Sequence, residues 1–266
     1  QDLLASKAAE LALVFVQLAY LLGQNYDSII TNPPYMNSSA MNEELKRYTQ
    51  EKYFLGKTDL YSCFVLRLTA ICKKTGYVGM ITIPNWLTLS SYTDYREYLI
   101  RNLSIASLLH MGRGIFGIDW GSTAFILERA HINNKKTSCY RLHKNTFKYI
   151  SPEDICELFL KANSNANFKF NFDAYTHRNI HHDAKGMQIY HIKAPEAFLS
   201  IPGNPIAYWM SDRDIDTFSE YKPLGKYLIT REGMATANND YFLRYWFEIS
   251  ADNRNSVFFS TQSPKW

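Results

Sequence analysis

The sequence is poor in cysteine and has no pair in the C-x-x-C spacing that zinc sites and redox motifs use. Its four cysteines are Cys63, Cys72, Cys139 and Cys156. Scattered thiols of this kind argue against a zinc site and against a disulfide framework. We therefore expect no bound metal and a reducing, cytoplasmic location.

The excess of positive over negative charge is also small, with a formal net charge of only +4 over 266 residues. This balance permits a nucleic-acid partner without requiring one. Aromatic residues are abundant instead, with 19 Tyr and 16 Phe, and such side chains serve both protein cores and base-stacking surfaces. With 46% hydrophobic residues, the chain can bury a core of its own.

A hydrophobic run long enough for a bilayer span is missing. The most apolar segment, Leu11–Leu22, is short, is interrupted by Gln17 and follows Lys7 and Glu10. We expect it to belong to a buried core helix, and we expect no membrane partner. The chain opens at Gln1 without an initiator Met, which predicts a piece of a larger protein.

One rigid segment stands out from this background: Asn32-Pro33-Pro34-Tyr35, directly after the apolar run 26–31. A β-branched run stopped by two prolines predicts a buried strand that ends abruptly. Each proline fixes φ and lacks an N–H, so that the carbonyl groups here have few local donors. An amide side chain, a free carbonyl and an aromatic ring held together in this way suit an exocyclic amino group on a planar ring.

Such an amine is a weak nucleophile because its lone pair is delocalised into the ring. Hydrogen-bond acceptors on both N–H groups would free the lone pair, and Asn32 Oδ1 and the Pro33 carbonyl are suited to this, with Pro34 keeping the turn rigid. Tyr35 is placed to stack on a base extruded from its duplex. A plain strand-ending turn is the alternative, but open α/β sheets bind ligands at strand ends, which favours a site.

Helical and strand patterns alternate over residues 1–130, which predicts an α/β fold with a mostly parallel, buried sheet. The expected helices span 3–23, 42–53, 59–74 and 94–102, and the expected strands span 27–31, 77–83, 104–111 and 122–128. After about Lys135 the segments become short and irregular, apart from a predicted helix over Pro152–Lys161. We place a domain boundary near residue 150.

Residues 27–35 resemble the catalytic motif of gamma-type amino-methyltransferases that act on adenine in DNA. The resemblance continues through Lys57-Thr58-Asp59-Leu60-Tyr61 with Phe64, Gly76 to Thr82, Pro84 to Leu87, Ser90-Ser91-Tyr92 with Arg96, His110-Met111-Gly112 to Phe116, and Ser122 to Leu127. Together these segments look most like the methyltransferases of BREX phage-resistance systems and of type IIG restriction-modification. The match is good over Asp27–Leu127 and resumes more weakly at Ile201–Trp209 and Gly233–Phe247.

The resemblance implies a partial Rossmann-like methyltransferase sheet within residues 1–150, followed by an irregular α+β linker and the start of a target-recognition region over 151–266. It implies that Asn32 and Pro33 accept the amine hydrogens, that Tyr35 stacks on a flipped adenine, and that Phe116 packs against the same base. The implied methyl donor is S-adenosylmethionine and the implied substrate is double-stranded DNA. The implied protein partners are the rest of the parent chain and other defence-system subunits.

In the resembled family the donor sits mainly on a Gly-rich loop and an acidic ribose ligand, both upstream of Asn-Pro-Pro-Tyr. Here 31 residues precede Asn32, and Gly23 is the one glycine among them. We therefore expect the donor-binding half to lie outside the chain and the chain alone to be inactive. Methylation of RNA or of a protein glutamine, and a non-catalytic DNA-binding role, remain as alternatives. The extension beyond residue 150 favours DNA.

Three other patterns receive plainer interpretations. Residues 112–117 spell G-x-G-x-x-G, but a strand rather than a helix is expected after them, so a nucleotide-binding loop is not predicted. His177, His181 and His182 with Asp183 are interpreted as a solvated polar loop rather than a metal site. The acidic residues 212–216 are interpreted as the first turn of a helix that begins at Ser211.

Overall fold

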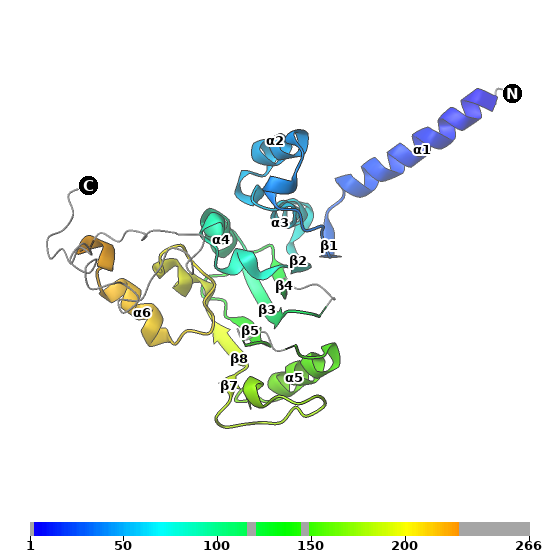
Figure 1. Cartoon of the computed structure of the whole chain (residues 1–266). Helices are drawn as coiled ribbons and strands as arrows, with labels where there is room; N and C mark the ends of the chain where they lie inside the picture. The colour runs from blue at the N-terminus through cyan, green and yellow to red at the C-terminus, as the bar shows by residue number, and fades with distance from the viewer. Residues whose placement is uncertain (1–2, 116–120, 145–148, 229–266) are drawn as a thin grey trace, which may run out of the picture. The chain divides into compact units, whose positions relative to one another are not determined.

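A six-stranded sheet organises the first unit of the chain, Gln1–Tyr221 (Figure 1). The computed structural model describes residues 3–115, 121–144 and 149–228, and a second unit begins at Lys222. In spatial order the strands are β1 (Tyr26–Thr31), β2 (Cys72–Thr82), β4 (Ser122–Glu128), β3 (Ser104–Gly112), β5 (Thr137–Arg141) and β8 (Tyr190–Lys193). A separate two-stranded sheet pairs β6 (Lys169–Phe170) with β7 (Met187–Gln188).

Four of the six strands in this sheet run in one direction, namely β1, β2, β3 and β5. β1 is parallel to β2, and β3 is parallel to β5, whereas β4 lies antiparallel between β2 and β3, and β8 is antiparallel to β5. The predicted α/β fold with a mostly parallel, partial Rossmann-like sheet is confirmed in the strand directions. Three of the five hydrogen-bonded pairs are nevertheless antiparallel, because β4 returns beside β3 and inserts next to β2.

Helices make the connections that parallel strands require. The helices are α1 (Leu3–Gly23), α2 (Glu43–Lys52), α3 (Leu60–Ile71), α4 (Thr93–Asn102), α5 (Pro152–Ser164) and α6 (Asp212–Glu220). Short 3-10 helices span Ser38–Ala40, Phe54–Gly56, Pro84–Leu87, Ser90–Tyr92, Phe172–Ala174, Pro195–Ser200 and Leu224–Lys226. α2 and α3 link β1 to β2, and α4 links β2 to β3, so the helices and strands expected up to residue 128 are confirmed in type and order. The end of the helix expected over 59–74 is wrong, because residues 72–74 already belong to β2.

Helix starts follow the capping residues in the sequence. Asn42 Oδ1 accepts a hydrogen bond from the Leu45 N–H at 2.8 Å at the start of α2. Ser151 caps α5, and Ser211 caps α6, as the acidic first turn after Ser211 predicted. Because each cap satisfies an otherwise unpaired helical N–H, the sequence specifies these boundaries locally.

The buried residues form two hydrophobic clusters. The first lies between the sheet and the helices α3 and α4, with Val65, Leu99 and Leu108 at 0 to 1% exposure. The second joins α5 to β5 and the chain that follows it, centred on Leu158 and Ile189. The proposed division near residue 150 stays a prediction, although β8, beyond that residue, joins the main sheet.

The prediction that α1 is a buried core helix is wrong for this chain. Every side chain from Ser6 to Leu22 is exposed, and the large apolar ones are 51 to 69% exposed. By length and composition alone, Ser6–Gly23 also qualifies as a membrane span, a test that core helices and signal sequences pass as well. The apolar pattern predicted the helix correctly, but the described contacts of α1 with other elements are confined to its last turn, where Arg67 donates to the Leu22 carbonyl at 3.4 Å.

β1 also differs from the predicted buried strand. It is an edge strand of the described sheet, and none of its residues is buried. Ile29 packs against the first cluster, whereas Ile30, on the opposite face, is 87% exposed. Alternation along a strand sends neighbouring side chains to opposite faces, and here only one face is covered.

Candidate active site

The ends of several aligned strands bring distant segments to one edge of the sheet. The turn Asn32–Tyr35 follows β1, Pro84 follows β2, and Gly112 ends β3. Gly121, just before β4, lies at the same edge, since a Cβ built there would stand 3.5 Å from Pro84 Cγ. The carboxyl edge of an open α/β sheet is the usual place for a ligand.

The Asn-Pro-Pro-Tyr turn presents the Asn32 amide to solvent. Asn32 and Pro34 are exposed, Pro33 is buried and Tyr35 is half-buried. The Tyr35 hydroxyl lies 2.8 Å from Asn32 Oδ1 and 3.2 Å from the Ile81 carbonyl oxygen. Burial raises the pKa of Tyr35, so the hydroxyl keeps its proton and is the donor in these contacts. No donor meets the Pro33 carbonyl among the residues that the structure describes.

The ring of Tyr35 is supported from α3. It meets Tyr61 edge-to-face, with 6.3 Å between ring centroids and an interplanar angle of 89°. Tyr61 is fully buried and stacks on Tyr92 at 6.1 Å. Edge-to-face pairs of this kind are favourable, and the buried partners limit the motion of the half-exposed Tyr35 ring.

Asp59 is a residue at this site to which the sequence analysis assigned no role. It is 3% exposed, and its Oδ1 accepts hydrogen bonds from the N–H of Met36 at 3.0 Å and of Tyr61 at 3.4 Å. Burial raises its pKa, against the opposing effect of these N–H groups. Asp59 is the N-cap of α3, whereas the sequence predicted a helix that includes this residue.

Arg96 connects this edge to the segment around residue 204. The guanidinium is fully buried and donates hydrogen bonds to four carbonyl oxygens. Its Nη1 lies 2.9 Å from the Trp86 oxygen and 2.7 Å from the Leu89 oxygen. Its Nε lies 3.2 Å from the Gly203 oxygen and 2.9 Å from the Asn204 oxygen. Burial lowers its pKa. The segments 84–92 and 201–207, both quoted in the family resemblance, are thus held against each other by one side chain.

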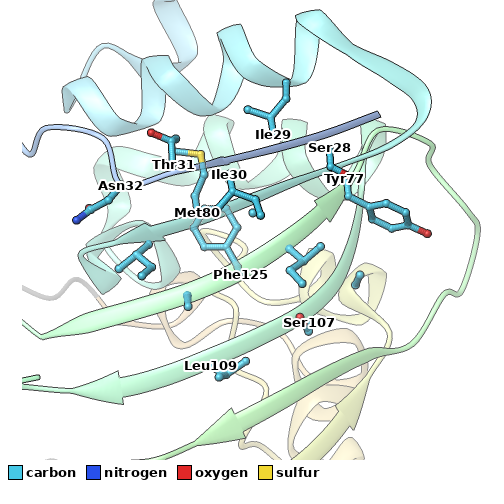
Figure 2. A pocket seen from close by; sticks show the side chains of 15 residues that line it. Ser28, Ile29, Ile30, Thr31, Asn32, Tyr77, Met80, Ser107, Leu109 and Phe125 are labelled. Carbon is cyan, nitrogen blue, oxygen red and sulfur yellow. The ribbon is translucent and has the colours of Figure 1, made fainter. Parts of the chain in front are cut away.

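A hollow of about 1000 Å³ lies over the uncovered face of the sheet (Figure 2). Its walls come from β1, β2, β3 and β4, including Ile30, Met80, Leu109 and Phe125. No acidic side chain lines it, and the described residues before Asn32 contain no Gly-rich turn. The residues that line this hollow therefore offer an adenosyl donor no charged partner, and its ribose and methionine parts need polar ones.

The predicted site residues have different outcomes. The structure brings Asn32, Pro33 and Tyr35 together at the carboxyl edge, with Pro34 in the same turn. Phe116 lies outside the described residues, in the connection between β3 and β4. The roles assigned to these residues stay predictions.

The histidine-rich loop has a structural partner. His177 Nδ1 lies 2.9 Å from Asp154 Oδ2, and His182 Nδ1 accepts a hydrogen bond from the Lys169 N–H at 3.1 Å. Within residues 3–115, 121–144 and 149–228, no group of three or more His, Cys, Asp or Glu side chains could hold a metal ion.

An α/β sheet with an Asn-Pro-Pro-Tyr turn at its carboxyl edge is the arrangement that the resemblance to amino-methyltransferases implies. Residues 4–116 match the Eco57I restriction-modification methylase family. The chain thus carries an Eco57I-like methylase domain, and the resemblance found in the sequence is confirmed.

Curated relatives extend this match. The chain is 28% identical to the adenine-specific methyltransferase BrxX of Escherichia coli O9:H4 (strain HS), over 96% of the chain and 19% of that protein. It is 30% identical to the adenine-specific methyltransferase PglX of Lacticaseibacillus casei (strain Zhang), over 88% of the chain and 18% of that protein. The chain therefore spans about a fifth of the length of these relatives.

Among solved structures, a type I restriction-modification methyltransferase subunit from Streptococcus thermophilus is similar to the chain. The TM-score is 0.45 at 15% sequence identity, and the match covers 69% of this chain and 37% of that one.

Proposed function

We propose that the chain is the catalytic part of an adenine-specific DNA methyltransferase of a restriction-modification or phage-defence system. The protein would transfer a methyl group from S-adenosylmethionine to the exocyclic amine of an adenine flipped out of duplex DNA. The observation that carries this proposal is the exposed Asn32 amide beside the Pro33 carbonyl, which no described donor meets, at the carboxyl edge of the sheet.

The residues of the turn would act on the target base and not on the methyl donor. Asn32 Oδ1 and the Pro33 carbonyl accept its two hydrogens, which localises the nitrogen lone pair and makes it available for attack. Proline at 33 and 34 keeps both acceptors in place without local N–H competitors. Tyr35 offers its ring to the face of the base, and Phe116 offers a second aromatic contact.

The donor site is proposed to lie on polypeptide beyond the described residues. Three exposed apolar features support this: the helix α1, the edge strand β1 and the hollow sheet face that Ile30 borders. Large exposed apolar surfaces mark sites of interaction. We propose that the donor-binding half of the methyltransferase domain covers these surfaces and that the chain without it is inactive.

The remaining parts of the proposal concern organisation. Residues 1–150 would be the catalytic half of the domain, and residues 151–266 would form a linker and the start of a target-recognition region. The protein would work in the cytoplasm on double-stranded DNA. Other subunits of the defence system would be its further partners.

The test is methylation of duplex DNA by the complete protein that carries this sequence, with labelled S-adenosylmethionine. Mass spectrometry of the digested DNA should find N6-methyladenine for the wild type and none above background for Asn32→Ala. Asn42→Ala is the matched control, because Asn42 only caps α2. If the labelled methyl group appeared in RNA or in a protein glutamine instead, that molecule and not DNA would be the substrate. DNA binding without any methylation would show a non-catalytic role.

A further inference from the structure

The proposed catalytic turn is bound on its C-terminal side by the segment Thr58–Leu60, which leads into α3. The backbone of Met36 and Ser38 pairs with Thr58 and Leu60: the Ser38 N–H donates to the Thr58 carbonyl and the Leu60 N–H to the Met36 carbonyl, each at 3.0 Å. This pairing leaves the Met36 N–H, the first donor after Tyr35, to be satisfied by a side chain. Asp59 supplies that acceptor.

Asp59 does more than cap its helix. Its bond to the capped Tyr61 N–H is 3.4 Å long, whereas its bond to Met36, 23 residues away in sequence, is 3.0 Å. The better hydrogen bond therefore goes to the catalytic turn. At the start of α2, by contrast, the capping residue Asn42 is exposed, and the described hydrogen bond of its side chain is the capping bond itself, at 2.8 Å.

The burial of the Asp59 carboxylate also indicates a role beyond helix capping. Burying a carboxylate is costly unless hydrogen bonds compensate it, and no Lys or Arg pairs with Asp59 in the described parts of the chain. Backbone N–H groups of Met36, Leu60 and Tyr61 stabilise the charged form, together with the N-terminus of α3. Capping alone does not need this arrangement, because Asn and Ser cap α2 and α5.

We propose that Asp59 is a positioning residue for methyl transfer, which holds the Tyr35–Met36 peptide so that Tyr35 and the Asn32–Pro33 acceptors keep their catalytic geometry. This inference rests on the proposed function and deepens it. Prolines 33 and 34 fix the turn before Tyr35, and Asp59 fixes it after Tyr35. Asp59 itself touches neither the base nor the donor.

The experiment separates capping from positioning with two substitutions in the complete protein. Asp59→Ser keeps a residue that caps helices well but has too short a side chain to reach Met36. Asp59→Asn keeps an oxygen at the position of Oδ1. Asn42→Ser is the matched control, since it makes the same exchange at a cap that is remote from the turn.

For Asp59→Ser we expect kcat to fall about 100-fold, as for a displaced catalytic group, with the KM for DNA and the melting temperature close to those of the wild type. Asp59→Asn should stay within about 10-fold of the wild-type kcat, because a neutral acceptor gives a hydrogen bond roughly half as strong. Asn42→Ser should keep the wild-type kcat.

A wild-type kcat in Asp59→Ser would overturn the inference, and so would an equally large loss in Asp59→Asn. A loss in Asp59→Ser that appears only as a lower melting temperature or a higher KM would also overturn it. Failure of the wild type and of Asn42→Ser to methylate adenine would instead reject the proposed function, on which the inference depends.

Discussion

The hydroxyl of Tyr35 donates a hydrogen bond to Asn32 Oδ1 at 2.8 Å, so the two ends of the proposed catalytic turn are joined directly. An Asn side chain can present either its oxygen or its NH2 group on a given side, and a donor against Oδ1 favours one orientation. The carbonyl oxygen has two lone pairs, and the second remains available to an amine. Tyr35 would thus orient the acceptor as well as stack on the base.

We expect Tyr35→Phe to lower kcat by about 10-fold, the effect of losing one oriented hydrogen bond of roughly 1.4 kcal/mol. The KM for DNA should change little, because the ring remains. Steady-state methylation of duplex DNA measures both constants. Tyr221→Phe, at an exposed tyrosine away from the turn, should match the wild type. An unchanged kcat in Tyr35→Phe would remove the hydroxyl from the mechanism.

Arg96 should contribute strongly to stability. Arg96→Met leaves four carbonyls without their donor, one of them in the buried residue Trp86, and we expect a loss of about 3 kcal/mol in the free energy of unfolding. Urea unfolding followed by tryptophan fluorescence measures this, since Trp86 is one of the contacts. Arg101→Met is the control, because Arg101 makes a surface ion pair with Glu97 worth at most about 0.5 kcal/mol. Equal losses in the two variants would contradict the assigned role.

Asp154 should make stability depend on pH in the acid range. Burial opposes its ionisation, but hydrogen bonds from the Tyr175 hydroxyl, the Arg178 N–H and His177 outweigh this and lower its pKa from 3.8 to about 2. A lowered pKa in the folded state stabilises the protein above the unfolded value, and the contribution is lost as the pH falls from about 4 to 2.

The measurement is the unfolding free energy of the wild type and of Asp154→Asn from pH 5 to pH 2. The wild type should be the more stable at pH 5, and the difference should shrink steadily toward pH 2. A constant difference over this range would show that the Asp154 carboxylate does not titrate as assigned.

The uncovered sheet face should be buried in the complete protein. Ile30→Thr keeps a β-branched residue in the edge strand β1 but adds a hydroxyl, and we expect a loss of about 1.5 kcal/mol where the face is covered. Ile192→Thr is the control, since Ile192 is 50% exposed on the edge strand β8. It should change stability by less than about 0.5 kcal/mol. Equal effects in thermal unfolding would argue against a covering segment.

Local signals in the sequence predicted most of the secondary structure. Asn42, Ser151 and Ser211 fix helix starts through their own side chains, and Pro33 ends β1 because it fixes φ and lacks an N–H. The apolar periodicity of α1 predicted the helix correctly and its burial wrongly. Periodicity reports which face a helix prefers to bury, not whether a partner is present.

The proposed catalytic turn was found because four neighbouring residues, Asn32 to Tyr35, form it. The residues that support it were not, since their contacts join positions far apart in the chain: Met36 to Asp59, Tyr35 to Tyr61, and Arg96 to Asn204. Sequence spacing does not show such contacts, and the sequence placed Asp59 inside the predicted helix 59–74 rather than at its cap.

By itself, then, the sequence determined the rigid turn that we propose acts on a target amine, because an amide, two prolines and a tyrosine in succession leave the backbone little freedom. Only the tertiary structure decided how that turn is held and what remains uncovered. It placed Asp59 and Tyr61 behind Asn32–Tyr35, and it left Ile30 exposed beside an apolar hollow. Both outcomes depend on which strands and helices pack together, and packing is a property of the folded chain rather than of any short segment.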